Sequence, residues 1–78
     1  MEIKYEYDKY GELIERWESE YKGMQVEARS NTRFGDVTKG TICTIEAEYF
    51  FNGQTWFTLQ KQNGENFESP TIFWDFIE

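Results

Sequence analysis

Aromatic side chains dominate the apolar part of this sequence. Its 78 residues include fifteen Phe, Tyr and Trp but only two leucines, Leu13 and Leu59. A chain of this length has room for one domain and one core, because small chains bury only about 60% of the surface that they expose when unfolded. The rings must therefore build the interior. A core of this size holds roughly ten large side chains, so we expect several rings to stay half exposed and to be available for binding.

The sequence lacks the residues that most enzymes and metal sites use. Histidine is absent and Cys43 is the only cysteine. An internal disulfide and the usual zinc sites are thereby excluded, and the commonest general base is missing. Cys43 alternates with Ile45 and Ala47, which indicates a small buried side chain rather than a reactive thiol. We therefore expect no enzyme, no metal and no cofactor.

The net charge of −7 comes from fifteen acidic and eight basic residues. Such a balance disfavours an ordinary nucleic-acid binder, whose affinity comes from neutralising phosphates. No stretch approaches the roughly 20 apolar residues of a membrane span. The charged first residues also lack the apolar region of a signal peptide. We expect a cytoplasmic protein with no membrane partner.

Positive charge is concentrated in one segment, residues 29–39. Arg29, Arg33 and Lys39 outnumber Asp36 there, whereas residues 40–78 are strongly acidic. The basic side chains of this loop could pair with phosphates, and the ring of Phe34 within it could stack on a base. Solvated loop charges are the simpler interpretation. Nucleic-acid binding through this loop is therefore kept as an alternative function.

The first 23 residues allow two interpretations after an initial strand. Residues 3–7 alternate apolar and polar side chains, which predicts a strand. A helical stripe then favours a short helix within residues 9–22, and Gly23 is a plausible stop. Against the helix, residues 8–11 form a good type I turn, with glycine at the left-handed position, which would make residues 2–18 a hairpin. The stripe consists of Tyr10, Leu13, Ile14, Trp17 and Tyr21.

From Met24 onward the pattern is β throughout, with closely spaced turn signals. In the central hairpin, a two-residue loop at Asn52-Gly53 would set Ile45 on the face opposite Leu59, which contradicts a single core. A three-residue loop at residues 51–53 brings Ile45 opposite Leu59, and we therefore predict that loop.

This register defines a candidate protein-binding surface. Phe50 and Trp56 become diagonal neighbours on the outward face, edged by Glu46 and Glu48. Trp is enriched where binding energy concentrates. The alternative is that residues 1–23 cover this face and make it a second core.

Residues 23–78 resemble a small SH3-like barrel, in particular the SH3-like and KOW-like proteins of phages and prophages. The resemblance lies in an opening strand at 23–29, a long first loop beginning at 31–35, a second strand at 39–45, and the segment Ser69-Pro-Thr-Ile-Phe73 as a single helical turn before the last strand. It implies a mainly β fold, with the barrel at about 24–78 and residues 1–23 as an N-terminal extension packed on it. SH3 domains that bind proline-rich peptides carry two adjacent tryptophans and a characteristic first-strand motif, and both are absent here. The resemblance therefore does not imply a proline-rich peptide as the ligand.

The expected function is accordingly a non-enzymatic protein-binding module. The resemblance implies a phage or mobile-element protein that acts on a larger host or viral protein. An acidic protein of this size that occupies a DNA-binding groove by mimicking phosphate charge is a further alternative. The sequence does not identify the partner or the oligomeric state.

Overall fold

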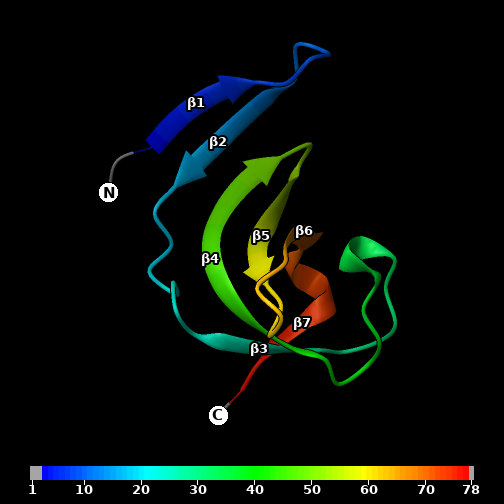
Figure 1. Cartoon of the computed structure of the whole chain (residues 1–78). Coiled ribbons are helices and arrows are strands. Elements are labelled where there is room, and N and C mark those ends of the chain that lie inside the picture. The colour runs from blue at the N-terminus through cyan, green and yellow to red at the C-terminus, as the bar shows by residue number, and fades with distance from the viewer. Residues whose placement is uncertain (1–2, 78) are drawn as a thin grey trace.

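The computed structural model describes residues 3–77, which form a mainly β domain without an α-helix. Seven strands make one antiparallel sheet that does not close on itself (Figure 1). The strands are β1 (Ile3–Tyr7), β2 (Leu13–Trp17), β3 (Gln25–Ala28), β4 (Ile42–Phe51), β5 (Gln54–Gln60), β6 (Asn66–Pro70) and β7 (Trp74–Phe76). Two 3-10 turns, η1 (Phe34–Asp36) and η2 (Thr71–Phe73), complete the elements.

The N-terminal segment is a β-hairpin, so the favoured helix over residues 9–22 is wrong and the hairpin alternative is confirmed. β1 pairs with β2 from Ile3↔Trp17 to Tyr7↔Leu13. Asp8 organises the turn: its carboxylate accepts hydrogen bonds from the backbone N–H groups of Tyr10 and Glu12. Gly11 has φ +79, as the left-handed position of this turn requires. These local bonds, together with the pairing of β2 with β4, outweigh the weak helical stripe.

β4 is the central strand of the sheet. One edge pairs with β5, whereas the other edge pairs first with β3 at residues 42–44 and then with β2 at residues 48–51. The N-terminal hairpin therefore lengthens the sheet sideways (Figure 1) instead of covering its face.

The register of the central hairpin differs from the predicted one. The loop is the two-residue Asn52-Gly53 turn, with φ values of 52° and 81°, as in a type I′ turn. Tyr49 consequently pairs with Trp56. The pairing nevertheless returns to Ile45↔Leu59, because a β-bulge lies between Ile45 and Ala47. The parity argument was wrong because it assumed an unbroken ladder. One extra residue on β4 moves Ile45 to the core face.

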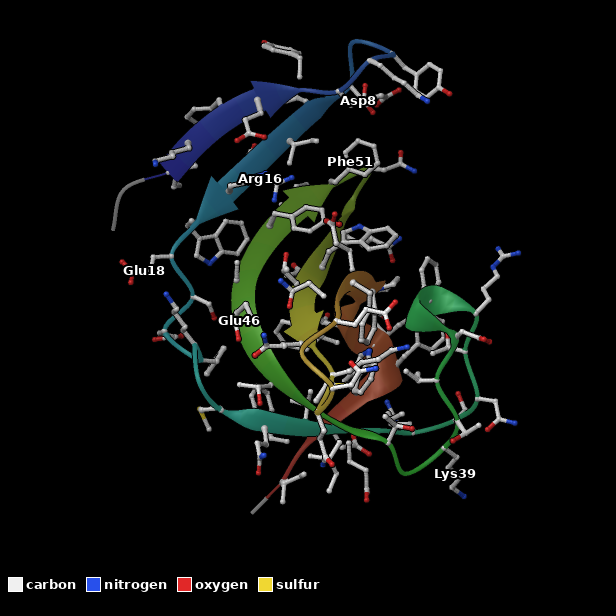
Figure 2. The ribbon with its side chains drawn as sticks, viewed as in Figure 1. Asp8, Arg16, Glu18, Lys39, Glu46 and Phe51 are labelled. Atoms are coloured by element: carbon white, nitrogen blue, oxygen red, sulfur yellow. The ribbon has the colours of Figure 1, made fainter. Side chains whose placement is uncertain are left out.

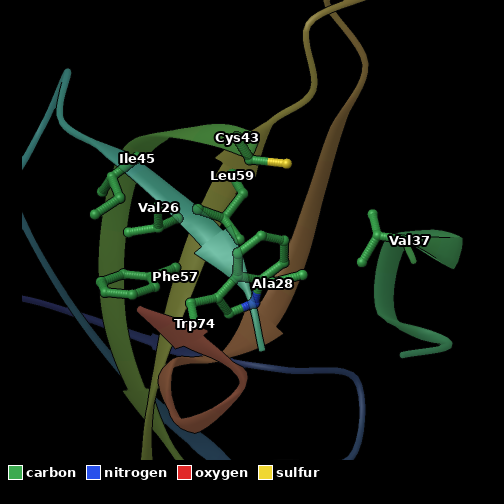
Figure 3. Close-up of a cluster of buried hydrophobic side chains, with 8 residues drawn as sticks. All are labelled: Val26, Ala28, Val37, Cys43, Ile45, Phe57, Leu59 and Trp74. Carbon is green, nitrogen blue, oxygen red and sulfur yellow. The ribbon is translucent and has the colours of Figure 1, made fainter. Parts of the chain in front are cut away.

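The core lies on one face of the curved sheet (Figure 3). Seven of its eight buried side chains come from strands β3, β4, β5 and β7, and Val37 comes from the long loop between β3 and β4. Cys43 is 1% exposed, as expected, and burial raises the pKa of its thiol. The strand members are Val26, Ala28, Cys43, Ile45, Phe57, Leu59 and Trp74.

The C-terminal elements follow the expected pattern. Ser69 and Pro70 end β6, the single turn η2 comes next, and β7 then pairs with β3 through Val26↔Phe76 and Ala28↔Trp74. Arg29 N–H donates to the carbonyl of Phe73, which ties η2 to the beginning of the long loop. The β3–β4 loop and η2 therefore lie next to each other, on the opposite side of the molecule from the N-terminal hairpin (Figure 1).

Candidate functional site

The observed register places a cation and two rings in one row across the sheet. Arg16 is opposite Tyr49, Tyr49 is opposite Trp56, and Trp56 is opposite Pro70. Cross-strand partners point to the same face. The Arg16 guanidinium lies 4.8 Å from the Tyr49 ring centroid, and the rings of Tyr49 and Trp56 are stacked with centroids 6.0 Å apart. These residues are on the face opposite the core.

Two loop aromatics extend this row beyond the strands. Phe34 of η1 makes an edge contact with Trp56, with centroids 5.5 Å apart. It also lies 5.9 Å from the ring of Phe73 in η2. Phe34, Trp56 and Phe73 are all half-buried. We call Tyr49, Trp56, Phe34 and Phe73 the aromatic row; its four rings come from β4, β5, η1 and η2.

Tight local geometry holds Phe34 in this row. The backbone N–H of Phe34 donates to Thr32 Oγ1 at 3.2 Å. The next residue, Gly35, has φ +69 and packs directly against the ring of Phe67, where a Cβ atom would overlap that ring. Only glycine fits both the backbone conformation and the space. Gly35 thus fixes the 3-10 turn that presents Phe34.

Burial and charge both affect the inner end of the row. Tyr49 is 6% exposed, and this burial, together with the nearby Glu68 carboxylate, raises the pKa of its hydroxyl. Arg16 is held in place by an ion pair between its Nε and Glu6 Oε2 at 3.0 Å. The Trp56 indole N–H donates to the carbonyl of Phe51 at 3.2 Å. Tyr49 is therefore buried at the inner end of the row, whereas Trp56, Phe34 and Phe73, which form its outer end, are half-buried.

The predicted pair of Phe50 and Trp56 is not a single surface. Phe50 pairs with Thr55, one position from the Tyr49↔Trp56 pair, so Phe50 and Trp56 point to opposite faces. Phe50 is 39% exposed and extends the core face towards the N-terminal hairpin. Neither side chain is covered by residues 1–23 as a second core, because the described part of that segment pairs edge to edge with β4.

The two glutamates predicted beside that pair have different environments. Glu46 lies in the bulge, where the pairing of β4 with β5 shifts. Glu48 is 8% exposed, pairs across the sheet with Trp17 and accepts a hydrogen bond of 2.5 Å from Ser19 Oγ. Glu48 is thus a structural residue that joins the end of the N-terminal hairpin to β4.

The basic residues predicted for nucleic acid lie in the β3–β4 loop. Arg29 pairs through its Nε with Asp75 Oδ1 at 3.4 Å and donates from Nη1 to the carbonyl of Ile72. The Arg33 guanidinium is 6.0 Å from the ring centroid of Phe34. Lys39 is exposed at the far end of the loop, and Figure 2 shows it well away from Glu46. Of these three cations, Arg29 is the one that forms an ion pair within the described residues.

Two hollows flank the sheet. One, of about 480 Å³, lies between the β3–β4 loop and the 61–63 turn. The other, of about 860 Å³, lies between the N-terminal hairpin and β4 and is lined by both acids and bases, among them Arg16, Glu18 and Glu46 (Figure 2). Because this second hollow is lined by both acidic and basic side chains, its charge does not favour a ligand that is purely cationic or purely anionic.

Within residues 3–77, no group of three or more acidic or cysteine side chains is arranged to hold a metal ion. The same part of the chain contains no helix of the length and apolar character that a membrane crossing requires.

The sequence did not indicate the aromatic row as a unit. Along the chain, Phe34, Tyr49, Trp56 and Phe73 are separated by 15, 7 and 17 residues. The register of β4 and β5 joins Tyr49 to Trp56, and the ring contacts of Phe34 add the two turns η1 and η2. The one available signal was Asn52-Gly53, whose preference for a type I′ turn pairs Tyr49 with Trp56. In comparisons with known proteins, no family model, no curated protein and no solved structure matches the chain.

Proposed function

We propose that this chain is an SH3-like domain that binds a protein partner through the outer end of its aromatic row. The strand arrangement supports the SH3-like assignment. β4, β5 and β6 form a meander, a long loop joins β3 to β4, and a single 3-10 turn precedes β7, which returns to pair with β3.

The carrying observation is the contact between Phe34, Trp56 and Phe73. The ring of Phe34 contacts those of Trp56 and Phe73 at centroid distances of 5.5 and 5.9 Å, and all three rings are half-buried. They lie outside the buried core cluster, apart from the contact that Phe73 makes with it. Rigid aromatic rings supply large contact area at low entropic cost, and Trp is enriched at binding hot spots. Ile72, the residue before Phe73 in η2, is 64% exposed.

Charge supports a protein rather than a nucleic acid as the partner. The chain carries −7, and Arg29 is already paired with Asp75. Arg33 lies beside the ring of Phe34, and one cation that is not already paired would neutralise few phosphates. An apolar segment of a protein fits half-buried rings better.

The test is affinity capture from a bacterial lysate, with and without nuclease, using the wild-type chain and Phe34→Ala. Phe34 lies on a loop, so its removal should weaken binding at least tenfold while leaving the fold intact, as checked by circular dichroism. Tyr10→Ala is the matched control, because Tyr10 is 78% exposed at the tip of the N-terminal hairpin. A protein retained by wild type and Tyr10→Ala but lost with Phe34→Ala supports the proposal. Equal retention by all three, or loss of all retained material on nuclease treatment, contradicts it.

A further inference from the structure

The outer edge of β1 is an open sheet edge. All five residues of β1 are exposed, and among the described residues its only strand partner is β2 (Figure 1). Tyr5 and Tyr7 are 62% and 73% exposed. No proline or bulge interrupts the strand, although such features commonly protect an edge from pairing.

The backbone groups at this edge can be assigned from the turn. The N–H of Asp8 donates to the carbonyl of Glu12, so the Asp8/Glu12 pair is hydrogen-bonded. Hydrogen-bonded and non-bonded pairs alternate along an antiparallel ladder. Lys4 and Glu6 therefore bond towards β2. Ile3, Tyr5 and Tyr7 direct their N–H and C=O groups outward, where a further strand can bind them.

We infer that β1 pairs antiparallel with β1 of a second copy, about a two-fold axis at Tyr5. In this register Tyr5 faces Tyr5 of the second copy and Ile3 faces Tyr7, so every outward backbone group of the three residues has a partner. The two sheets would join into one continuous sheet through an isologous interface.

Charge selects this register and favours a second copy as the occupant. Pairing centred on Tyr5 sets Lys4 opposite Glu6 of the other chain, twice. A shift that centres the pairing on Lys4 sets Lys4 opposite itself, and a shift that centres it on Glu6 sets Glu6 opposite itself. Like charges directly opposite are destabilising, whereas opposite charges stabilise a pair. Among the described residues, Lys4 has no carboxylate within ion-pair distance in the single chain, and the second copy supplies one.

The apolar face of the strand is also self-complementary. Ile3, Tyr5 and Tyr7 lie on the same face as Leu13 and continue the face of the core. In the two-fold pairing, these three residues of each chain form a ladder of six apolar side chains. Cross-strand aromatic and β-branched pairs of this kind add to the stability of a sheet. These residues are distinct from the aromatic row, so the inference does not rest on the proposed function.

The experiment measures mass in solution by analytical ultracentrifugation, from micromolar to millimolar concentration. The wild-type chain should reach twice its mass of 9.4 kDa. Lys4→Glu and Glu6→Lys should each return it to the single-chain mass, because like charges then face each other. An equimolar mixture of the two variants should restore the doubled mass, since each Glu of one chain now faces a Lys of the other. A wild-type chain that stays single at every concentration overturns the proposal, and so does a mixture that stays single.

A crosslink provides a second readout that does not depend on charge. Tyr5→Cys should form a disulfide between chains under mild oxidation, because directly opposite residues have Cα atoms about 5.5 Å apart, within the range that a disulfide spans. Tyr7→Cys faces Ile3 and should form many-fold less of the crosslinked species. Cys43 is buried and leaves both measurements unaffected. Equal crosslinking of the two variants overturns the proposal.

Discussion

The indole N–H of Trp74 donates to Ser69 Oγ at 2.9 Å, at a position where Ser69 has no solvent exposure. Ser69 in turn donates to the carbonyl of Pro70. This pair joins the end of β6 to the start of β7 inside the core, and it satisfies the one polar atom that the large Trp74 ring brings with it.

Replacing Ser69 with alanine should lower the free energy of unfolding by about 1 to 3 kcal/mol, because the Trp74 N–H would remain buried without an acceptor. Urea titration followed by tryptophan fluorescence measures the loss. The control is Ser30→Ala, at an exposed residue, which should change stability little. Equal stability of the two variants would show that the Trp74 N–H finds another acceptor.

Gly35 should tolerate a side chain less well than Gly11. Both have positive φ values, +69 and +79, and at both an alanine is expected to lose about 1 to 2 kcal/mol for the left-handed backbone. At Gly35 the new Cβ would also overlap the Phe67 ring, whereas at Gly11 nothing lies within 4 Å. Thermal unfolding of Gly35→Ala and Gly11→Ala should therefore show a clearly larger loss for Gly35→Ala. The reverse order would contradict the packing of η1 on β6.

An engineered disulfide can test the register of the central hairpin. Phe50 and Thr55 are directly opposite, and alternation from the turn makes them a non-hydrogen-bonded pair, in which side chains are closest. The double variant Phe50→Cys/Thr55→Cys should oxidise readily and leave one free thiol, that of Cys43, when titrated in denaturant. Phe50→Cys/Gln54→Cys is the matched control, since Phe50 would face Gln54 only with a three-residue loop. Preferential oxidation of the control would mean that the loop is Phe51-Asn52-Gly53.

Stability should decrease at alkaline pH because of Tyr49. Burial raises its pKa in the folded chain above the value of about 10 of an exposed tyrosine. Above about pH 10 the unfolded chain releases this proton while the folded chain keeps it, so the free energy of unfolding falls as pH rises, by at most about 1.4 kcal/mol per pH unit. Below about pH 10 Tyr49 holds its proton in both the folded and the unfolded chain, so its contribution to the free energy of unfolding is fully present there.

Tyr49→Phe keeps the stacked ring and removes the proton, so its stability should fall less steeply between pH 9 and pH 11 than that of the wild type. Urea unfolding at several pH values measures both slopes. Cys43, whose thiol pKa is also raised by burial, is present in both proteins and does not affect the comparison. Parallel slopes would show that Tyr49 does not contribute to the alkaline loss.

The mainly β character and the buried Cys43 were predictable from the sequence, because each rests on local chemistry. The choice between helix and hairpin at residues 9–22 was not. A one-sided stripe from Tyr10 to Tyr21 favours a helix, but β4 offers an open edge to β2, and pairing along that edge is a long-range contact that no local pattern reveals.

The candidate site was predicted incorrectly for a related reason. The outward pair of Phe50 and Trp56 followed from parity along β4, and parity fails wherever a bulge adds one residue. Glu46 itself gives no sign that it occupies such a position. Nor does spacing along the chain show that Phe34 and Phe73, on two separate turns, meet the ring of Trp56.

One edge of β4 is shared between β3 and β2, so the N-terminal hairpin can unfold locally without the rest of the sheet. The buried cluster contains no residue of the N-terminal hairpin, so the ladder between β2 and β4 can separate while the cluster stays closed. Amide protons of β1 and β2 should then exchange with deuterium through local opening, whereas those of Ile45 and Leu59 should exchange only on global unfolding. A second chain bound along β1 would slow the first class of protons and leave the second unchanged.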